Sequence, residues 1–302
     1  MKHQRNRNIA GWLVAFVCAV TFPSCVYRAP DEDWEKHGRI RLHLNWQTRG
    51  EYPSGMTYYF YKDGTGRPLI RSGNASGYEG TLPSGQYKVA VCNMDHTNLV
   101  LEMEDGYDRA LGKVRQVSTL KSSPVHLAHP ANLYGAGCQL INVGGEEMVA
   151  EELYPTGLVK TFEMNIRLSG VDRLSPEGVS GRLTGVSSHI HIPSGTPLFD
   201  TPAFMLFEPS AVNSDIYSTS LSMFGLSEGG ENGGPVELYL TLKTKDGKEI
   251  TSYTDISKEI SNAFNNGLSA HIILDLVIAF DEINGLTITI TDWKEGTGEA
   301  GN

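Results

Sequence analysis

The chain of 302 residues lacks most of the short motifs that identify enzymes. It has no P-loop, GxSxG, HExxH or EF-hand string, and so no recognisable phosphate-binding, nucleophilic or metal motif of these kinds. Its uncharged N-terminal run, Ile9 to Phe22, has 14 residues, whereas a membrane-spanning helix needs about 20. We therefore predict a protein that is not an enzyme, has no cofactor or metal, and does not cross a membrane through this run.

Positive charge is also scarce. There are 25 Lys and Arg against 35 Asp and Glu, which gives a formal net charge of −10. Three of the basic residues fall in the first 24 positions, so the remaining chain has 22 basic and 35 acidic residues and a net charge of −13. Because such a field repels polyanions, it disfavours nucleic acid and anionic membrane surfaces as partners.

The N-terminus has the layout of a secretory signal. Basic Lys2, Arg5 and Arg7 come first, the apolar run follows, and small Ser24 precedes Cys25. We assign residues 1–24 to a signal peptide. The segment ending in Cys25 resembles the lipobox of Bacteroidetes lipoproteins, so Cys25 is the predicted lipid attachment site and residues 25–37 a tether. An ordinary cleavage site with a chance cysteine is the alternative.

Only Cys92 and Cys138 remain once Cys18 leaves with the signal and Cys25 is assigned to lipid. A location outside the cytoplasm permits a disulfide between them, and two buried thiols are the alternative. Neither has a CxxC neighbour, so the sequence indicates no zinc or redox site.

Glycine (33 residues) and proline (14 residues) separate short runs of alternating apolar residues, which is typical of an all-β protein. Apolar residues at every second position make Ile40 to Trp46 a half-buried strand. The same reasoning predicts further strands at Met56–Tyr61, Tyr87–Val91, Phe162–Leu168, Val236–Thr244, Ile272–Phe280 and Leu286–Thr291.

The second half repeats the turn pattern of the first. Lys-Asp-Gly occurs at 62–64 and 245–247, and Pro-Ser-Gly at 83–85 and 193–195. Two similar β-sandwiches in series explain this repetition. We expect an N-terminal sandwich at 38–150, a C-terminal one at 158–294, a boundary at Glu151 to Gly157, and a flexible tail at 295–302.

One short helix is predicted in the second sandwich. Thr254 or Asp255 can cap it, and Ile256, Ile260 and Phe264 would share one face. A glycine-rich segment at 227–235 is predicted to be a loop.

Candidate ligands and platforms are few. His189 and His191 would share one strand face and His126 lies near His129, but no cluster of further ligands accompanies either pair, so we interpret them as solvent-facing. Runs of carboxylates such as Glu151-Glu152 are interpreted as solvated. Five aromatic residues could form a sugar-stacking platform, although core packing is the commoner use of strand aromatics: Trp34, Trp46, Tyr58, Tyr59 and Tyr61.

The order of several short segments carries a family resemblance. After the lipobox cysteine come PSGMTYYFYKDG, LPSGQYKVAVCNMD, LYG at 133–135, SGRLTGVSSHIHIPSG, FGL at 224–226, LKTKDGKEI, TDISKEI and a late ITDW. This order resembles the fimbrillin-associated anchor and minor-subunit lipoproteins of Bacteroidetes type V pili.

The resemblance implies two tandem transthyretin-like (Greek-key) sandwiches, held in the outer membrane by the lipid and exposed at the cell surface. It also implies an anchor or accessory role in a fimbria, with subunits joined by strand donation, in which a donated segment extends a sheet. The segment after Trp293 lacks apolar alternation, so we expect this chain to accept a strand along an edge of the first sandwich. A glycan-binding lipoprotein of a polysaccharide-uptake system is the alternative function, and a hydrolase with an unrecognised site is a third.

Overall fold

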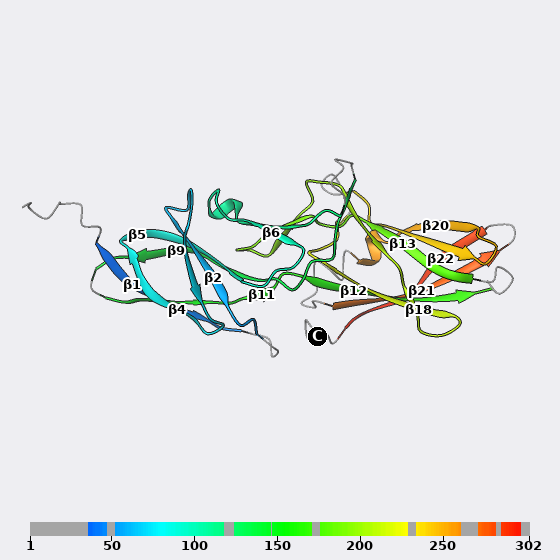
Figure 1. The fold of residues 1–302 in the computed structure, drawn as a ribbon, viewed down its shortest axis with the longest axis horizontal. Helices are drawn as coiled ribbons and strands as arrows, with labels where there is room; N and C mark the ends of the chain where they lie inside the picture. Colours follow the sequence, from blue (N-terminus) through cyan, green and yellow to red (C-terminus); the bar gives the residue numbers. More distant parts are fainter. Residues whose placement is uncertain are drawn as a thin grey trace, which may run out of the picture. The chain divides into compact units, whose positions relative to one another are not determined.

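Strands dominate the computed structural model, which describes residues 36–46, 52–117, 124–145, 147–170, 176–228, 234–260, 271–281 and 285–296 (Figure 1). The predicted all-β fold is confirmed. A helical turn at 257–260 and a 3₁₀ helix, Tyr107–Arg109 (η1), are the other regular elements in this part of the chain. The strands are His37–Leu44 (β1), Met56–Lys62 (β2), Leu69–Gly73 (β3), Gly77–Pro83 (β4), Gly85–Asn93 (β5), Leu99–Glu102 (β6), Leu111–Val114 (β7), Val125–His126 (β8), Tyr134–Val143 (β9), Val149–Leu153 (β10), Thr156–Gly157 (β11), Lys160–Ser169 (β12), Pro176–Thr184 (β13), His189–His191 (β14), Thr196–Leu198 (β15), Ala203–Phe207 (β16), Ser210–Ala211 (β17), Ile216–Met223 (β18), Glu237–Thr244 (β19), Glu249–Asp255 (β20), His271–Asp281 (β21) and Gly285–Glu295 (β22).

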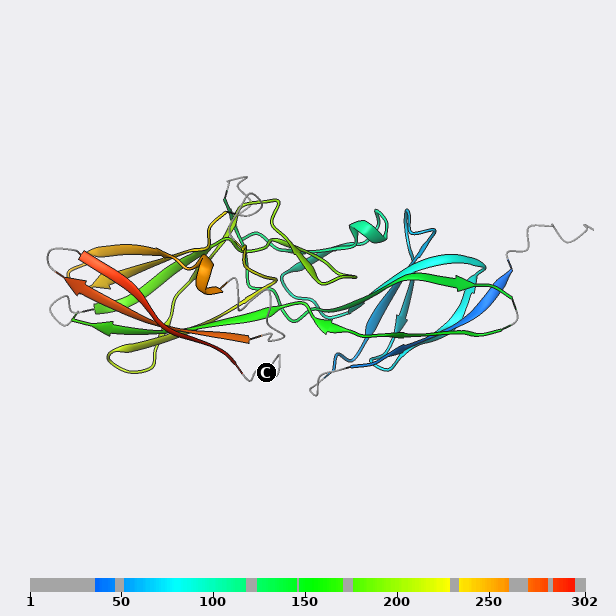
Figure 2. The same ribbon diagram turned by 180° about the vertical axis from the view of Figure 1, so that it is seen from behind.

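The N-terminal sandwich has two facing sheets. Their strand orders are β10-β1-β4 and β11-β9-β5-β2-β3. Buried and exposed residues alternate through β1 because successive side chains of a strand point to opposite faces. Its buried residues Ile40, Leu42 and Leu44 share one core with residues of the facing sheet such as Phe60 and Tyr87. In Figure 2, β1 (blue) and the green segment of β10 run side by side.

The C-terminal sandwich is built in the same way. Its sheets have the orders β17-β18-β12-β21-β22 and β20-β19-β13-β16-β8. Phe162, Met164 and Ile166 of β12 are fully buried, and they share a core with Leu238 and Leu240 of β19.

Both sandwiches follow one topology. The strands β1, β2, β3, β4, β5, β9 and β10 correspond in chain order to β12, β13, β16, β18, β19, β20 and β21. Each pairing keeps its direction: the first strand pairs parallel with the last and antiparallel with the fourth. The prediction of two similar sandwiches is confirmed. Beyond β21, the second sandwich has a further strand, β22, which lies antiparallel to β21 (Figure 1).

A further sheet, of order β15-β14-β7-β6, contains strands from both halves of the chain. Its middle pair joins β7 to β14, with His189 opposite Lys113. Tyr61 and Cys92 of the first half also belong to the same buried cluster as Phe162. The two halves therefore share a sheet and part of a core.

The turn chemistry agrees with the sequence in part. Asp63 and Gly64 both have positive φ, 54° and 74°, which favours glycine and, among other residues, aspartate. An Asp-Gly pair favours a two-residue hairpin, but β3 begins only at Leu69, so Asp63 and Gly64 do not form one. At the later Asp-Gly pair, only Gly247 has a positive φ.

Two expected boundaries differ from the structure. Residues 149–153 form β10 and residues 156–157 form β11, so the strand pattern continues through the segment expected to separate the sandwiches. The tail was expected from residue 295, but Glu295 still pairs with Ile272. An isolated terminal segment and a paired strand end look alike in sequence when both are polar.

The structure describes the first turn of the predicted helix, at residues 257–260. Asp255 Oδ1 accepts hydrogen bonds from the backbone N–H of Ser257 at 2.9 Å and from its hydroxyl at 2.5 Å, which confirms Asp255 as the cap. Ile256 and Ile260 are buried. Phe264, the signal peptide, Cys25, Trp34 and most of the glycine-rich segment lie outside the described residues. Within the described residues, no helix has the length and apolar character needed to span a membrane.

Candidate functional site at the edge of the first sandwich

The outer edge of β10 differs from its counterpart in the second sandwich. There β22 pairs with β21 along its whole length, from Ile272 opposite Glu295 to Asp281 opposite Gly285. In the first sandwich β10 pairs with β1 on one side, and no described strand pairs with its other side. The first sandwich thus has an uncovered sheet edge at the place that β22 occupies in the second.

Burial differs at the same place. Ile272, Leu274 and Leu276 of β21 are at most 2% exposed. The positions of β10 that point inward are Val149, Glu151 and Leu153, because they lie opposite the buried Ile40, Leu42 and Leu44. Of these three, only Leu153 is buried, and Glu151 is exposed.

A groove lies at the end of this edge. It has a volume of about 210 Å³ and is lined by residues 135–137 of β9, Glu152 and Leu153 of β10, Tyr154, Thr156 and the turn 193–195. Glu152 is held by Asn45, whose Nδ2 donates to Oε1 at 2.9 Å, and by Tyr154, whose hydroxyl donates to Oε2 at 2.7 Å. These bonds lower the pKa of the Glu152 carboxyl, so it stays charged at the rim of the groove.

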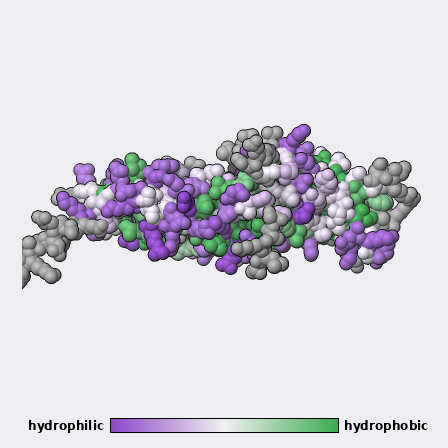
Figure 3. Space-filling view, turned by 90° about the horizontal axis from the view of Figure 1, so that it is seen from above, coloured by the Kyte–Doolittle hydropathy of each residue, from purple (hydrophilic) through white to green (hydrophobic). Residues whose placement is uncertain are grey.

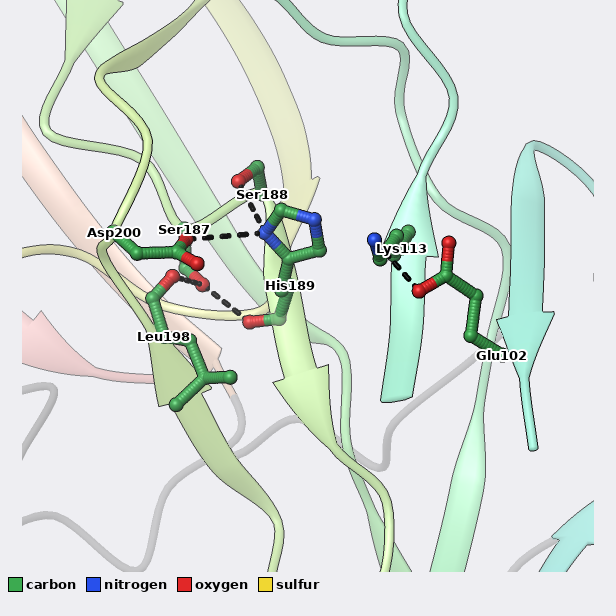
Figure 4. Close-up of polar contacts among 7 residues, drawn as sticks. All are labelled: Glu102, Lys113, Ser187, Ser188, His189, Leu198 and Asp200. Atoms are coloured by element: carbon green, nitrogen blue, oxygen red, sulfur yellow. Dashed lines mark hydrogen bonds and ion pairs between the residues drawn. The ribbon is translucent and has the colours of Figure 1, made fainter. Parts of the chain in front are cut away.

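A cluster around His189 resembles catalytic residues in composition (Figure 4). His189 Nδ1 lies 2.8 Å from the hydroxyl of Ser188 and 3.3 Å from a carboxylate oxygen of Asp200. On the neighbouring strands, Lys113 forms an ion pair of 2.7 Å with Glu102. Burial lowers the pKa of His189, and the Asp200 carboxylate opposes this effect.

The geometry of this cluster does not match a nucleophilic triad. In a triad the two imidazole nitrogens have different partners: one accepts the serine proton, and the other donates a hydrogen bond to the carboxylate. Here Ser188 and Asp200 both contact Nδ1. The neighbouring Ser187 hydroxyl lies near two backbone carbonyl oxygens, those of His189 at 2.6 Å and Leu198 at 2.8 Å, which holds β14 to β15. We therefore interpret the cluster around His189 as structural: its contacts hold β14 against β15.

The two histidines of β14 lie on one face, as predicted, but each has its own partners. His191 contacts the Ser194 hydroxyl through Nδ1 at 2.8 Å and the backbone oxygen of Tyr107 through Nε2 at 3.1 Å. His126 stacks on Phe204 instead of joining His129. Among the residues that the structure describes, no three His, Cys, Asp or Glu side chains form a group suited to a metal ion.

The two remaining cysteines are free thiols. Cys92 lies opposite Gly135, whereas Cys138 lies opposite Val89. Three residues therefore separate them along the paired strands, about 10 Å at roughly 3.3 Å per residue, while a disulfide needs Cα atoms within about 7 Å. The thiol alternative holds, with Cys92 buried and Cys138 partly so.

The candidate platform residues that the structure describes are largely internal. Tyr58 and Tyr61 are 0% exposed, and burial raises the pKa of both phenols. The Tyr61 hydroxyl donates to the backbone oxygen of Met103 at 2.9 Å. These side chains therefore pack in the core, as aromatic residues in strands commonly do.

Comparison with known proteins gives one family and a shared fold. A family model described as "Domain of unknown function (DUF5119)" matches residues 24–208. No curated protein matches the chain.

Three solved structures illustrate the fold. A candidate adhesin of Bacteroides ovatus is 18% identical with a TM-score of 0.62, covering 84% of this chain and 93% of its own. The fimbrial anchor protein Mfa2 of Porphyromonas gingivalis is 13% identical with a TM-score of 0.57, covering 85% and 96%. A candidate polysaccharide-binding protein of Bacteroides thetaiotaomicron is 12% identical with a TM-score of 0.56, covering 85% and 96%. At these identities the likeness establishes the fold, and none of the three is described as an enzyme.

Proposed function

Because this chain belongs to the DUF5119 family, whose description assigns no activity, and shares its fold with a fimbrial anchor and an adhesin, we propose that it is a surface-exposed outer-membrane lipoprotein of a fimbria-like assembly. In this role it is the anchor or an accessory subunit, and it accepts a β-strand donated by a partner subunit. The free edge of β10 carries the proposal.

The second sandwich supplies the physical precedent for a donated strand. β22 lies antiparallel to β21, with Leu286 buried and Ile288 and Ile290 packed against the core. A strand of a partner would lie antiparallel to β10 in the same way. Its backbone would satisfy the unpaired N–H and C=O groups of the edge, and its alternate side chains would enter the sandwich.

Glu151 sets a condition on the donor. It points to the interior side of β10 and is exposed, so a donor would bring this carboxylate into a less polar environment. Burying a charge without a partner is costly. We therefore expect a basic or hydrogen-bonding residue in the donor opposite Glu151, with apolar residues two positions away on either side, facing Val149 and Leu153.

The membrane end of the proposal rests on Cys25. The signal layout ends at this cysteine, and the family match begins at Ser24. On the face shown in Figure 3, small apolar groups lie scattered among hydrophilic residues. This surface is compatible with exposure to water at the cell surface.

The test uses peptides that alternate apolar residues around a central lysine, with each sequence also supplied in a version shifted by one residue. We expect the in-register peptide to bind the full chain at least about tenfold more tightly, since a one-residue shift turns the apolar set outward. Fluorescence anisotropy of a labelled peptide measures the affinity.

Two variants identify the edge. Glu151→Arg should abolish binding by repelling the peptide lysine. Ile70→Lys, on the exposed edge strand β3 of the facing sheet, should leave binding unchanged. Equal binding of both registers would refute strand acceptance, and loss of binding in Ile70→Lys alone would move the acceptor edge to β3.

A further inference from the structure

A row of planar side chains crosses the outer face of the sheet β20-β19-β13-β16-β8 in the second sandwich. Tyr253 and Tyr239 are stacked with ring centroids 5.3 Å apart and planes inclined by 23°. The guanidinium carbon of Arg182 lies 4.1 Å from the centre of the Tyr239 ring and 5.7 Å from that of Phe204. Phe204 in turn stacks on His126 at 5.1 Å. Each of the five strands contributes one member.

The strand register produces this row. Tyr239 lies directly opposite Tyr253 on one side and Arg182 on the other, and Phe204 lies opposite His126. Directly opposed side chains of neighbouring strands stand about 5 Å apart on the same face, which is stacking distance for planar groups. The five members lie at positions from 126 to 253, so no local sequence motif predicts this row.

A cleft of about 800 Å³ lies along the row, and Arg182, Tyr239 and His126 form part of its lining. Ligand pockets of this size accept small molecules and short oligomers. Much of the remaining lining is rich in hydroxyl groups, which both donate and accept hydrogen bonds: Ser180, Thr219, Ser220, Thr241 and Thr251.

The charges in the cleft are balanced. Arg182 supplies one positive charge and Glu208 one negative charge. Burial lowers the pKa of His129, so this side chain is neutral at pH 7. Arg182 is held between two rings and its guanidinium interacts with the Tyr239 hydroxyl, while its Nε is buried without a hydrogen-bond partner. A buried donor without a partner is uncommon in proteins, and the other guanidinium nitrogens of Arg182 are the donors that a ligand in the cleft can reach.

We propose that this cleft binds a neutral saccharide chain. Sugar hydroxyls would pair with Arg182, Glu208 and the threonine and serine hydroxyls of the lining. Tyr253 lies outside the lining, but it stacks on the lining residue Tyr239 and is 62% exposed, so a sugar ring at the end of the chain would pack on it. A balanced lining rich in hydroxyl groups does not select for a charged ligand. The inference does not depend on strand acceptance, since it concerns a sheet of the other sandwich.

The experiment runs the full chain, in mild detergent, through native gels that contain dextran, mannan, xylan or, as an acidic comparison, polygalacturonate. We expect at least one neutral polymer to slow migration. Tyr253→Ala and Arg182→Met should weaken this retardation about tenfold, the loss expected when a stacking or charged contact is removed. Tyr52→Ala removes a tyrosine that is 45% exposed in the first sandwich and should have no effect.

The outcomes separate the possibilities. Failure of all three neutral polymers to slow the protein overturns the proposal, and so does retardation by polygalacturonate alone. Equal losses in Tyr253→Ala and Tyr52→Ala would overturn the assignment of binding to this row, because Tyr52 lies in the first sandwich. Normal peptide binding at β10 by Tyr253→Ala and Arg182→Met, measured in parallel, shows that the variants are folded and keeps this test distinct from that of strand acceptance.

Discussion

Glu151 lies opposite Leu42 in the parallel pair of β10 and β1, so both side chains point to the interior side of the first sandwich, yet Leu42 is 1% exposed and Glu151 is exposed. A charge that points inward on an edge strand is one of the devices by which natural sheets avoid pairing edge to edge. Glu151 therefore disfavours pairing of the free edge of β10 with an apolar strand.

Glu151→Val should turn this edge into a self-association site. The substitution removes the inward charge and leaves an apolar, unpaired strand, so we expect dimers or larger species at micromolar concentration in analytical ultracentrifugation. Glu249→Val introduces the same change at an exposed position of β20, and this control should remain monomeric. A monomeric Glu151→Val protein would mean that something other than Glu151 protects the edge.

Cys138 should react with N-ethylmaleimide in the native protein, and Cys92 only after unfolding. Burial raises the pKa of the Cys92 thiol to about 12, and the reactive species is the thiolate. Mass spectrometry of the labelled peptides measures both sites. Protection of both cysteines that is relieved only by a reductant would indicate a disulfide and contradict the register of β5 and β9.

Gly181→Ala should lower the free energy of unfolding by about 1–3 kcal/mol, the usual cost of overpacking a core. A Cβ at Gly181 would overlap the ring of Phe207, which is 5% exposed and has little room to move. Gly178→Ala is the matched control on the same strand, because a Cβ there would meet nothing within 4 Å. Urea denaturation of both variants measures the difference, and equal stabilities would show that the Phe207 ring relaxes freely.

Stability should fall as the pH drops below about 6.5, the ordinary pKa of histidine, partly because of His189. Burial lowers the pKa of this side chain in the folded protein, so the unfolded chain binds the proton more tightly. The contribution of neutral His189 is therefore present above that pH and is lost below it. Urea midpoints at about pH 7.5 and 5.5 should differ less in His189→Gln than in the parent. His43→Gln, at an exposed position of β1, should keep the parent's difference.

Under the proposed lipid anchoring, Cys25→Ala should release the protein from the membrane fraction, because alanine has no thiol that could carry the lipid. Membrane fractionation followed by immunoblotting measures the distribution. A parallel Cys138→Ala variant should stay in the membrane fraction as the parent does. Membrane retention of the Cys25 variant would contradict lipid anchoring at this residue.

The sequence by itself determined the fold class and the strands whose apolar residues alternate clearly. Alternation of apolar residues is a local property of a strand with one buried face, and the predicted strands at Ile40, Phe162 and Ile272 are present as β1, β12 and β21. The cap at Asp255 and the positive φ values of Asp63 and Gly64 are equally local, since each depends on one or two neighbouring residues.

Only the tertiary structure decided which strands lie side by side. It thereby decided both proposed sites, the free edge of β10 and the cleft along the row of planar side chains. Glu151-Glu152 looked like a polar interruption because their pairing partner, β1, lies more than a hundred positions earlier. The row from Tyr253 to His126 exists only because five distant strands adopt one register. Pairing between strands is set by the packing of whole sheets, so the sequence specifies these neighbours through the complete fold and not through any segment that can be read alone.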